Sequence, residues 1–222
     1  IDHVKACRNI ATDMGRACKS PCITNIWIPD GMKDLTPNRM MYRSILKKSL
    51  DEILSEKKDP KFCKESLECK LFGIGSESFV VGSHEFYMGY IGDAKASGND
   101  DLMITLDMGH FHPTETIADK ISSLLLFNKE ILVHVSRGIR WDSDHVVISN
   151  EDVQEVMREI KRADAFGRVH LALDFFDASI NRISAWVVGS RATQKAILGA
   201  LLEPTQLLKD AEDKGDYGSR LA

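Results

Sequence analysis

Short apolar runs alternate with longer amphipathic segments along most of this chain. Residues 102–107 form an apolar run typical of a buried strand, and the apolar residues of 114–127 then recur at helical spacing. This order repeats to give about five strand-then-helix units, each roughly 30–40 residues long. Regular alternation predicts a parallel sheet, and right-handed crossovers place the carboxyl ends of its strands on one side. The sequence therefore predicts an α/β fold.

The expected elements can be placed along the chain. We expect strands at residues 21–28, 64–70, 102–107, 131–135 and 168–176. We expect helices at residues 4–19, 38–57, 85–90, 114–127, 151–166 and 183–202, a surface excursion at 92–101 and a charged, less ordered tail after Pro204. A closed (β/α)8 TIM barrel needs eight strand–helix units. We therefore interpret residues 1–222 as part of one larger barrel domain.

The composition limits the classes of partner. A formal charge of −4 argues against nucleic acid, which usually binds a basic face. The longest apolar run, residues 121–127, is interrupted by Ser122 and Ser123, so we expect no membrane span. Five cysteines without zinc-ribbon spacing favour free thiols in a reducing compartment. No targeting signal is visible, which makes the cytoplasm the expected location.

Polar side chains stand at the predicted strand ends or in the loops directly after them. They are Glu68, Lys70, Asp107, His110, His134, Asp142, Asp144 and Asp174. Two divalent cations close together need several carboxylates to offset their charge and imidazoles to complete their coordination. A carboxylate-rich set without cysteine suits Mn²⁺ or Mg²⁺ better than a structural zinc. The strand ends therefore predict a site for divalent metal ions.

Each of these residues also has a purely structural explanation. A histidine inside an apolar strand, such as His134, is more often a hydrogen-bonded core residue than a ligand. Asp174 can cap a turn, and Lys70 with Glu68 can form a surface ion pair of little energetic value. The convergence of the whole set on one face of the sheet is what favours a functional site.

Several long motifs resemble one known family. They occupy residues 68–75, 85–90, 107–115, 134–137, 140–147 and 173–182, and the stretch at 27–34 fits as well. Together they closely resemble L-rhamnose isomerase. The resemblance extends over essentially the whole chain.

The resemblance implies a (β/α)8 barrel related to that of xylose isomerase. Because the family's chain is longer at both ends, this chain would cover roughly the later five units, the metal-binding portion of a single barrel domain. A catalytic ion would be bound by His110, Asp142 and Asp144. A second, structural ion would be bound by Glu68, Asp107, His134 and Asp174. Members are typically manganese-dependent cytoplasmic homotetramers that interconvert L-rhamnose and L-rhamnulose, with Mg²⁺, Co²⁺ or Zn²⁺ as alternative ions.

The expected reaction is a reversible aldose–ketose isomerisation through a metal-assisted 1,2-hydride shift. Lys70 would bind the substrate and act in catalysis, by hydrogen-bonding the sugar oxygen on which negative charge develops. Asp174 would also be catalytic, in ring opening or proton transfer. Trp27 would form an apolar wall against the C–H face of the sugar.

Three alternatives stay open at this point. A sugar 3-epimerase on a related barrel would need two facing carboxylates around one metal, and the second ligand set argues against it. A metal-dependent barrel endonuclease would need a basic groove, which the charge of −4 does not support. The third alternative is a truncated, metal-binding fragment without activity.

Overall fold

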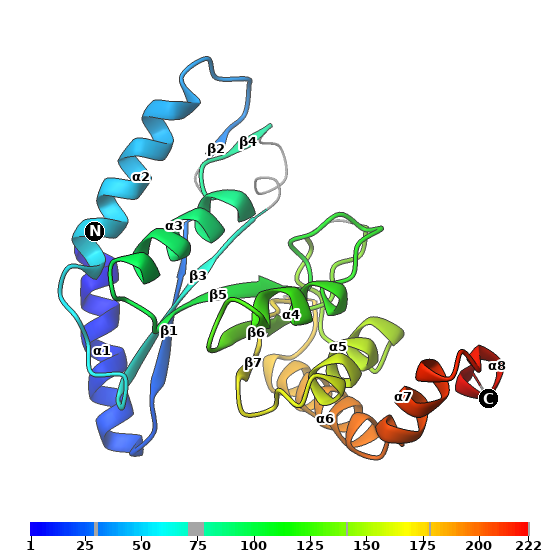
Figure 1. Cartoon of the computed structure of the whole chain (residues 1–222). Coiled ribbons are helices and arrows are strands. Elements are labelled where there is room, and N and C mark those ends of the chain that lie inside the picture. The colour runs from blue at the N-terminus through cyan, green and yellow to red at the C-terminus, as the bar shows by residue number, and fades with distance from the viewer. Residues whose placement is uncertain (29–30, 71–77, 141, 178, 222) are drawn as a thin grey trace.

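The computed structural model describes residues 1–28, 31–70, 78–140, 142–177 and 179–221. Parts of the motifs at 27–34, 68–75, 140–147 and 173–182 therefore lie outside the described residues. Within these ranges the chain forms a parallel sheet with helices packed along it (Figure 1).

The main sheet has five strands in the order β1-β3-β5-β6-β7. The strands are β1 (Cys22–Trp27), β3 (Cys63–Glu68), β5 (Leu102–Asp107), β6 (Ile131–Val135) and β7 (Val169–Leu173). Each pairs in parallel with the next, so the sheet grows in one direction as it does in a barrel. The sheet is curled and open, which confirms the predicted α/β fold as part of a barrel (Figure 1). The short strands β2 (Gly31–Met32) and β4 (Phe79–Val80) form a separate antiparallel ribbon.

The helices alternate with the strands of the main sheet until β7, after which the chain is helical. They are α1 (Asp2–Cys18), α2 (Arg39–Leu54), α3 (His84–Ala96), α4 (Ala118–Leu125), α5 (Glu151–Arg162), α6 (Arg182–Leu201), α7 (Thr205–Asp213) and α8 (Tyr217–Leu221). At the start of α2, α5 and α6 an asparagine side chain accepts hydrogen bonds from backbone amides of the first turn, which satisfies donors that the helix cannot pair itself. These residues are Asn38, Asn150 and Asn181.

Helices α3 and α4 differ most from their predicted ranges, and α2 and α5 end earlier than predicted, at Leu54 and Arg162. Helix α3 continues to Ala96, so it includes the first part of the surface excursion predicted at 92–101. Ile91 is buried in the core beside Tyr90 and extends the apolar face beyond the predicted end of the helix. Helix α4 begins at Ala118 instead of residue 114. Residues 112–115 form a turn, in which the Glu115 amide donates to the His112 carbonyl oxygen at 2.8 Å.

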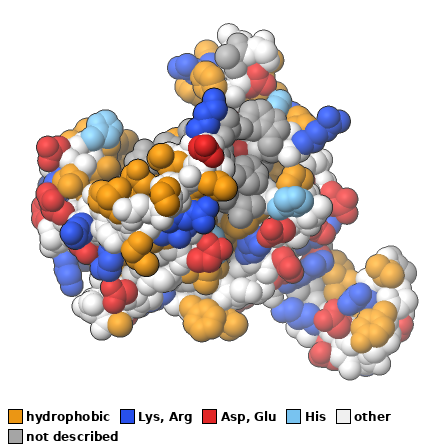
Figure 2. Space-filling view, turned by 90° about the horizontal axis from the view of Figure 1, so that it is seen from above, with side chains coloured by type: hydrophobic (Ala, Val, Ile, Leu, Met, Phe, Trp, Pro, Cys, Tyr) orange, Lys and Arg blue, Asp and Glu red, His pale blue; other side chains and the backbone are white. Residues whose placement is uncertain are grey.

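The segment after Pro204 is helical, so the prediction of a less ordered tail is wrong. Proline suits the start of a helix because its missing amide hydrogen would be unpaired there. Arg162 at the end of α5 donates to both carboxylate oxygens of Glu203, at 2.9 and 2.5 Å, and Lys209 donates to the Arg162 carbonyl oxygen at 2.7 Å. These bonds attach α7 to the body of the domain. Helices α7 and α8 form a lobe on which acidic and basic side chains are intermixed (Figure 2).

Three expectations from composition can be compared with the fold. In the described ranges, every helix is too short or too polar to cross a membrane. All five cysteines are free, as their spacing predicted. On the face shown in Figure 2, basic and acidic side chains are interspersed.

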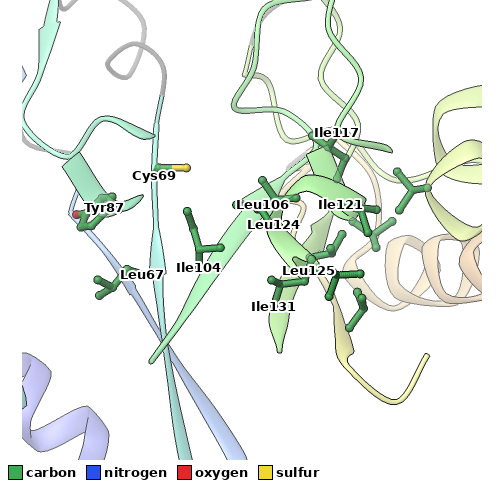
Figure 3. Close-up of a cluster of buried hydrophobic side chains, with 14 of the residues drawn as sticks. Leu67, Cys69, Tyr87, Ile104, Leu106, Ile117, Ile121, Leu124, Leu125 and Ile131 are labelled. Carbon is green, nitrogen blue, oxygen red and sulfur yellow. The ribbon is translucent and has the colours of Figure 1, made fainter. Parts of the chain in front are cut away.

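The core lies between the outer face of the sheet and the helices. Leu67 of β3 and Leu106 of β5 are fully buried with Tyr87 of α3 and the apolar side of α4 (Figure 3). Side chains alternate between the two faces along a strand, so the next residue of each strand lies on the opposite face. The strands that build the core therefore present Glu68 and Asp107 to the inside of the curled sheet.

Helix α1 is attached to the sheet by a buried charge. The guanidinium of Arg8 is fully buried and donates to the Glu65 carboxylate and to the carbonyl oxygens of Ile53 and Glu56. One side chain thus joins α1 to the end of α2 and to β3. A buried guanidinium with these partners fixes the position of α1 along its axis.

Candidate metal centre

Four neighbouring strands end at one set of predicted ligands. Glu68 and Asp107 are the last residues of β3 and β5. His134 is the last but one residue of β6, and Asp174 directly follows β7. The register pairs Asp107 with His134. Parallel strands ending on the same side therefore bring all four side chains to the inner edge of the sheet.

These four side chains form a tight cluster around one imidazole nitrogen. One ligand atom from each lies within 4.8 Å of those of the others. His134 Nδ1 lies 3.2 Å from Glu68 Oε1, 3.5 Å from Asp107 Oδ2 and 3.0 Å from Asp174 Oδ2. Glu68, Asp107 and His134 are buried, whereas the Asp174 side chain is 53% exposed. Three carboxylates and one imidazole thus converge at a site that is open on the side of Asp174.

Only one of the two oxygens of the Asp107 carboxylate accepts hydrogen bonds from the described part of the chain. Its Oδ1 accepts hydrogen bonds from the Gly109 amide at 2.6 Å and from Ser136 Oγ at 2.7 Å. Its Oδ2 is buried and receives no hydrogen bond from the described part of the chain, although it faces His134. A buried carboxylate oxygen without a donor is costly unless a cation lies beside it. The donor set and this unpaired oxygen together fit a divalent cation.

The second predicted ligand set is arranged more loosely. His110 Nε2 lies 3.3 Å from Asp142 Oδ2, which also accepts from the Lys70 ammonium. Asp142 Oδ1 is buried without a hydrogen bond from the described residues. Asp144 lines the same cavity, with a left-handed backbone at φ 45°. Within the described ranges only the first set forms a cluster in which four ligand atoms meet.

Glu68 stands between the two sets. Its Oε1 lies 3.2 Å from His134 Nδ1 and 3.3 Å from His110 Nδ1. One carboxylate oxygen therefore faces the imidazoles of both predicted sites. The orientation of the Glu68 side chain therefore affects the surroundings of both imidazoles.

The electrostatic field of the site is strongly negative. Burial alone would lower the pKa of His134, but Asp107, Asp174 and Glu68 more than offset burial and raise this pKa to about 11. Burial would also lower the pKa of His110, but Asp142 and the other carboxylates outweigh burial and raise this pKa to about 9. Both imidazoles therefore carry a proton at neutral pH when no metal is present. The positive charge of the protonated rings then offsets part of the negative charge that a metal cation would otherwise neutralise.

The same field also raises the pKa of Asp144. Burial raises its pKa, and the negative charges of Asp142 and Asp107 raise it further, to about 6. Its neighbour Asp142 stays ionised, because His110 and Lys70 outweigh burial and hold the pKa of Asp142 below its ordinary value. Two neighbouring carboxylates thus differ in pKa through their surroundings alone.

A cavity of about 670 Å³ opens beside the cluster. Trp27, the last residue of β1, lies on its wall and stacks on His110 with ring centroids 6.5 Å apart. The Lys70 ammonium lies 5.1 Å from the centre of the Trp27 ring and is 4% exposed. The structure thus places both predicted substrate-binding residues at this cavity, which is also lined by the second ligand set and by Glu68 and Asp174 of the first.

The residues that orient the ligands were not predicted from the sequence. They are Asn25, Ser66, Thr105, Gly109 and Ser136. Asn25 is the one member with a signal in the sequence, because an amide inside a short β-rich run must find a partner. The hydroxyls of serine and threonine carry no such signal, since both residues are common in strands and loops.

The chain was compared with known proteins. The family model of L-rhamnose isomerase matches residues 1–222. The chain is 54% identical to the L-rhamnose isomerases of Rhodopirellula baltica and Enterobacter sp. strain 638 and 53% identical to that of Shigella sonnei, over all of its 222 residues. It covers 51% of the first of these relatives and 52% of the other two, so it spans about half the length of the curated relatives it matches.

A comparison with solved structures supports the fold. The crystal structure of a D-tagatose 3-epimerase-like protein matches with a TM-score of 0.59 and 17% sequence identity, covering 89% of this chain and 69% of that one. Identity at this level informs only about the architecture, which is shared. The match of the family model over the full chain, together with identities above half, shows that this chain belongs to the L-rhamnose isomerase family.

Proposed function

We propose that the protein carrying this chain is an L-rhamnose isomerase, which reversibly converts the aldose L-rhamnose into the ketose L-rhamnulose. The observation that carries the proposal is the four-residue cluster at the strand ends, beside a cavity of about 670 Å³. A cavity of this volume lies within the range of roughly 300–1,000 Å³ that small-molecule sites occupy. The names of the curated relatives agree with the proposal.

Two groups of residues would hold the metal ions. Glu68, Asp107, His134 and Asp174 would bind the structural ion, and His110, Asp142 and Asp144 the catalytic one. We propose Mn²⁺ in both places, with Mg²⁺, Co²⁺ or Zn²⁺ as alternatives, because oxygen-rich ligation with few imidazoles suits such ions. When bound, the metal would supply Lewis-acid polarisation of the sugar carbonyl.

The protein side chains would bind the sugar and handle its protons. The Lys70 ammonium, buried beside Asp142, would donate a hydrogen bond to the sugar oxygen on which charge develops. The half-exposed Asp174 carboxylate stays ionised, since His134 holds its pKa below the ordinary value, and would accept a hydroxyl proton during ring opening. Trp27, 39% exposed, would present its ring face to the sugar C–H groups.

The reaction balances without a co-reactant. The hydrogen on C2 of the open-chain aldose moves with its electron pair to C1, and the O2 proton moves to O1. C2 is thereby oxidised and C1 reduced within one molecule.

Product analysis in D₂O tests this function. We expect Mn²⁺-dependent formation of L-rhamnulose from L-rhamnose, with almost no solvent deuterium at C1 or C2, measured by NMR on a protein that carries this chain at the length of its relatives. The 222-residue chain tested beside it shows whether this segment holds a complete pocket. Epimerisation at C3, or no conversion by the longer protein, would overturn the proposal, and extensive deuterium incorporation would replace the hydride shift by a proton transfer.

Metal affinity is expected to rise with pH. A metal binds the neutral imidazole, so each ion that uses His134 must displace the proton held by a group whose pKa is about 11. Below that pKa, each displaced proton makes the apparent affinity rise about tenfold per pH unit. Titration calorimetry with Mn²⁺ at pH 7 and 8, in buffers of different ionisation enthalpy, measures the affinity and counts the protons. An affinity independent of pH would exclude His134 as a ligand.

Location and assembly complete the proposal. We propose a cytoplasmic homotetramer whose partner is a small sugar, with neither nucleic acid nor membrane as a ligand. Light scattering on the protein at the length of its relatives tests the tetramer: a mass of one or two chains would contradict it.

A further inference from the structure

We propose that Asn25 is a positioning residue, which fixes the carboxylate of Glu68 at the end of a hydrogen-bonded chain that starts at Ser66 and passes through Thr105. The inference rests on the proposed metal centre, and it concerns residues that are not themselves ligands. The chain connects the three neighbouring strands β1, β3 and β5 on the inner face of the sheet.

The strand register places the four members together. Asn25 pairs with Ser66 across β1 and β3, and Thr105 pairs with Glu68 across β3 and β5. The Asn25 side-chain amide donates to Glu68 Oε2. Asn25 Oδ1 accepts from Thr105 Oγ1 at 2.7 Å, and Thr105 Oγ1 lies 2.6 Å from Ser66 Oγ. Ser66 and Thr105 are completely buried, so water cannot replace either partner.

The direction of every hydrogen bond follows from counting donors. Asn25 must turn its NH₂ group toward Glu68, because its carbonyl oxygen would repel the carboxylate. Its carbonyl oxygen is then left for Thr105, whose single hydroxyl proton is used on it. Ser66 must therefore donate to Thr105. The hydroxyl at position 105 must therefore accept one hydrogen bond and donate another.

Of the predicted metal ligands, this chain of hydrogen bonds contacts Glu68. With Oε2 held by Asn25, Oε1 is directed to His134 and His110, at 3.2 and 3.3 Å. Without Asn25 the carboxylate can rotate, and the oxygen that faces both imidazoles loses its position. Partners that orient metal ligands in this way typically contribute about 10–100-fold to metal affinity.

Two substitutions at position 105 separate the hydrogen bond from the packing. Thr105→Val keeps the shape and removes the hydroxyl, whereas Thr105→Ser keeps the hydroxyl and removes a methyl group. We expect Thr105→Val to weaken Mn²⁺ binding about 10–100-fold, and Thr105→Ser to stay within about threefold of the unchanged chain. Binding is measured on the full chain from the electron paramagnetic resonance signal of free Mn²⁺, which requires no activity.

Asn25→Leu provides a second test if Thr105→Val fails to fold. It removes both contacts of the amide but leaves Thr105 and Ser66 paired with each other. The same loss of about 10–100-fold is expected. Circular dichroism confirms that each variant is folded before its affinity is compared.

The inference is overturned if the folded Thr105→Val or Asn25→Leu chain binds Mn²⁺ as tightly as the unchanged chain. It is also overturned if Thr105→Ser loses as much affinity as Thr105→Val, because packing would then explain both. A chain that binds no Mn²⁺ overturns the metal centre and this inference together. Tight Mn²⁺ binding by this chain, with no conversion of L-rhamnose by the protein at the length of its relatives, overturns the proposed function alone.

Discussion

Replacing Asp107 by asparagine is expected to reduce Mn²⁺ affinity by more than the roughly 100-fold that the loss of a hydrogen bond to a ligand can cost. The substitution keeps the shape of the side chain and replaces one carboxylate oxygen by an NH₂ group. Oδ1 is already committed to the Gly109 amide and Ser136, so the amide nitrogen must take the position of Oδ2. A donor would then point at the cation, where the native residue offers an unpaired oxygen.

The expected loss can be measured in two independent ways. Direct Mn²⁺ titration gives the affinity. Thermal unfolding gives a second value, because a ligand at about 100 times its dissociation constant stabilises the folded state by about 2.7 kcal/mol. We expect the unchanged chain to show a Mn²⁺-dependent rise in Tm and the Asp107→Asn chain to show none at the same concentration.

Asp164→Asn is a matched control for this substitution. Asp164 is exposed and lies outside the cluster, in a left-handed conformation at φ 52° that asparagine also adopts readily. We expect unchanged Mn²⁺ affinity in this variant, although it removes the same formal charge. Equal losses in both variants would show a non-specific effect of net charge and would contradict the ligand role of Asp107.

The strand ends could be predicted from the sequence because their prediction needs only the local pattern of apolar and polar residues. An acidic or imidazole group at or next to the end of an apolar run identifies the end of a strand, and parallel topology then brings these groups together. Asp107 and His134 were found in this way, and the structure places them in the same cluster. The curled, partial barrel followed from counting strand–helix units, and the sheet order agrees.

The hydrogen-bonded supports of the site required the register between strands. Asn25 and Thr105 are 80 residues apart, and nothing in either local sequence connects them. The predicted helix boundaries were wrong for a different reason. The end of α3 depends on the burial of Tyr90 and Ile91 against the sheet, and α7 depends on the attachment of Lys209 to α5, so both are decided by tertiary contacts.

The position of α1 depends on tertiary contacts that no local sequence pattern reveals, and Gly15 makes the closest of them. A Cβ atom at Gly15 would lie 1.9 Å from the Phe62 carbonyl oxygen. That oxygen accepts a hydrogen bond from the Cys22 amide at 2.9 Å, at the start of the β1–β3 pairing. Helix α1 cannot slide to make room, because Arg8 attaches it to β3 and to the end of α2. Only glycine allows the helix to cross the strand end at this distance.

Gly15→Ala is therefore expected to destabilise the fold, although alanine is the better helix former. Overpacking against well-packed surroundings typically costs about 1–3 kcal/mol, and a backbone obstacle puts this site at the upper end. The helix propensity of alanine returns about 1 kcal/mol, which leaves a net loss of about 2 kcal/mol. In a protein of this length this corresponds to a fall in Tm of roughly 4–8 °C, measured by calorimetry without metal.

Gly89→Ala separates the steric effect from propensity. Gly89 is exposed in the interior of α3, and a Cβ atom there would have no atom within 4 Å. The same chemical change should therefore stabilise the chain by up to about 1 kcal/mol and raise Tm by roughly 2–4 °C. Opposite signs at the two positions would show that α1 is fixed against the Phe62 carbonyl. A rise in Tm at Gly15 would instead mean that α1 is free to move away from the sheet, which is incompatible with the buried contacts of Arg8.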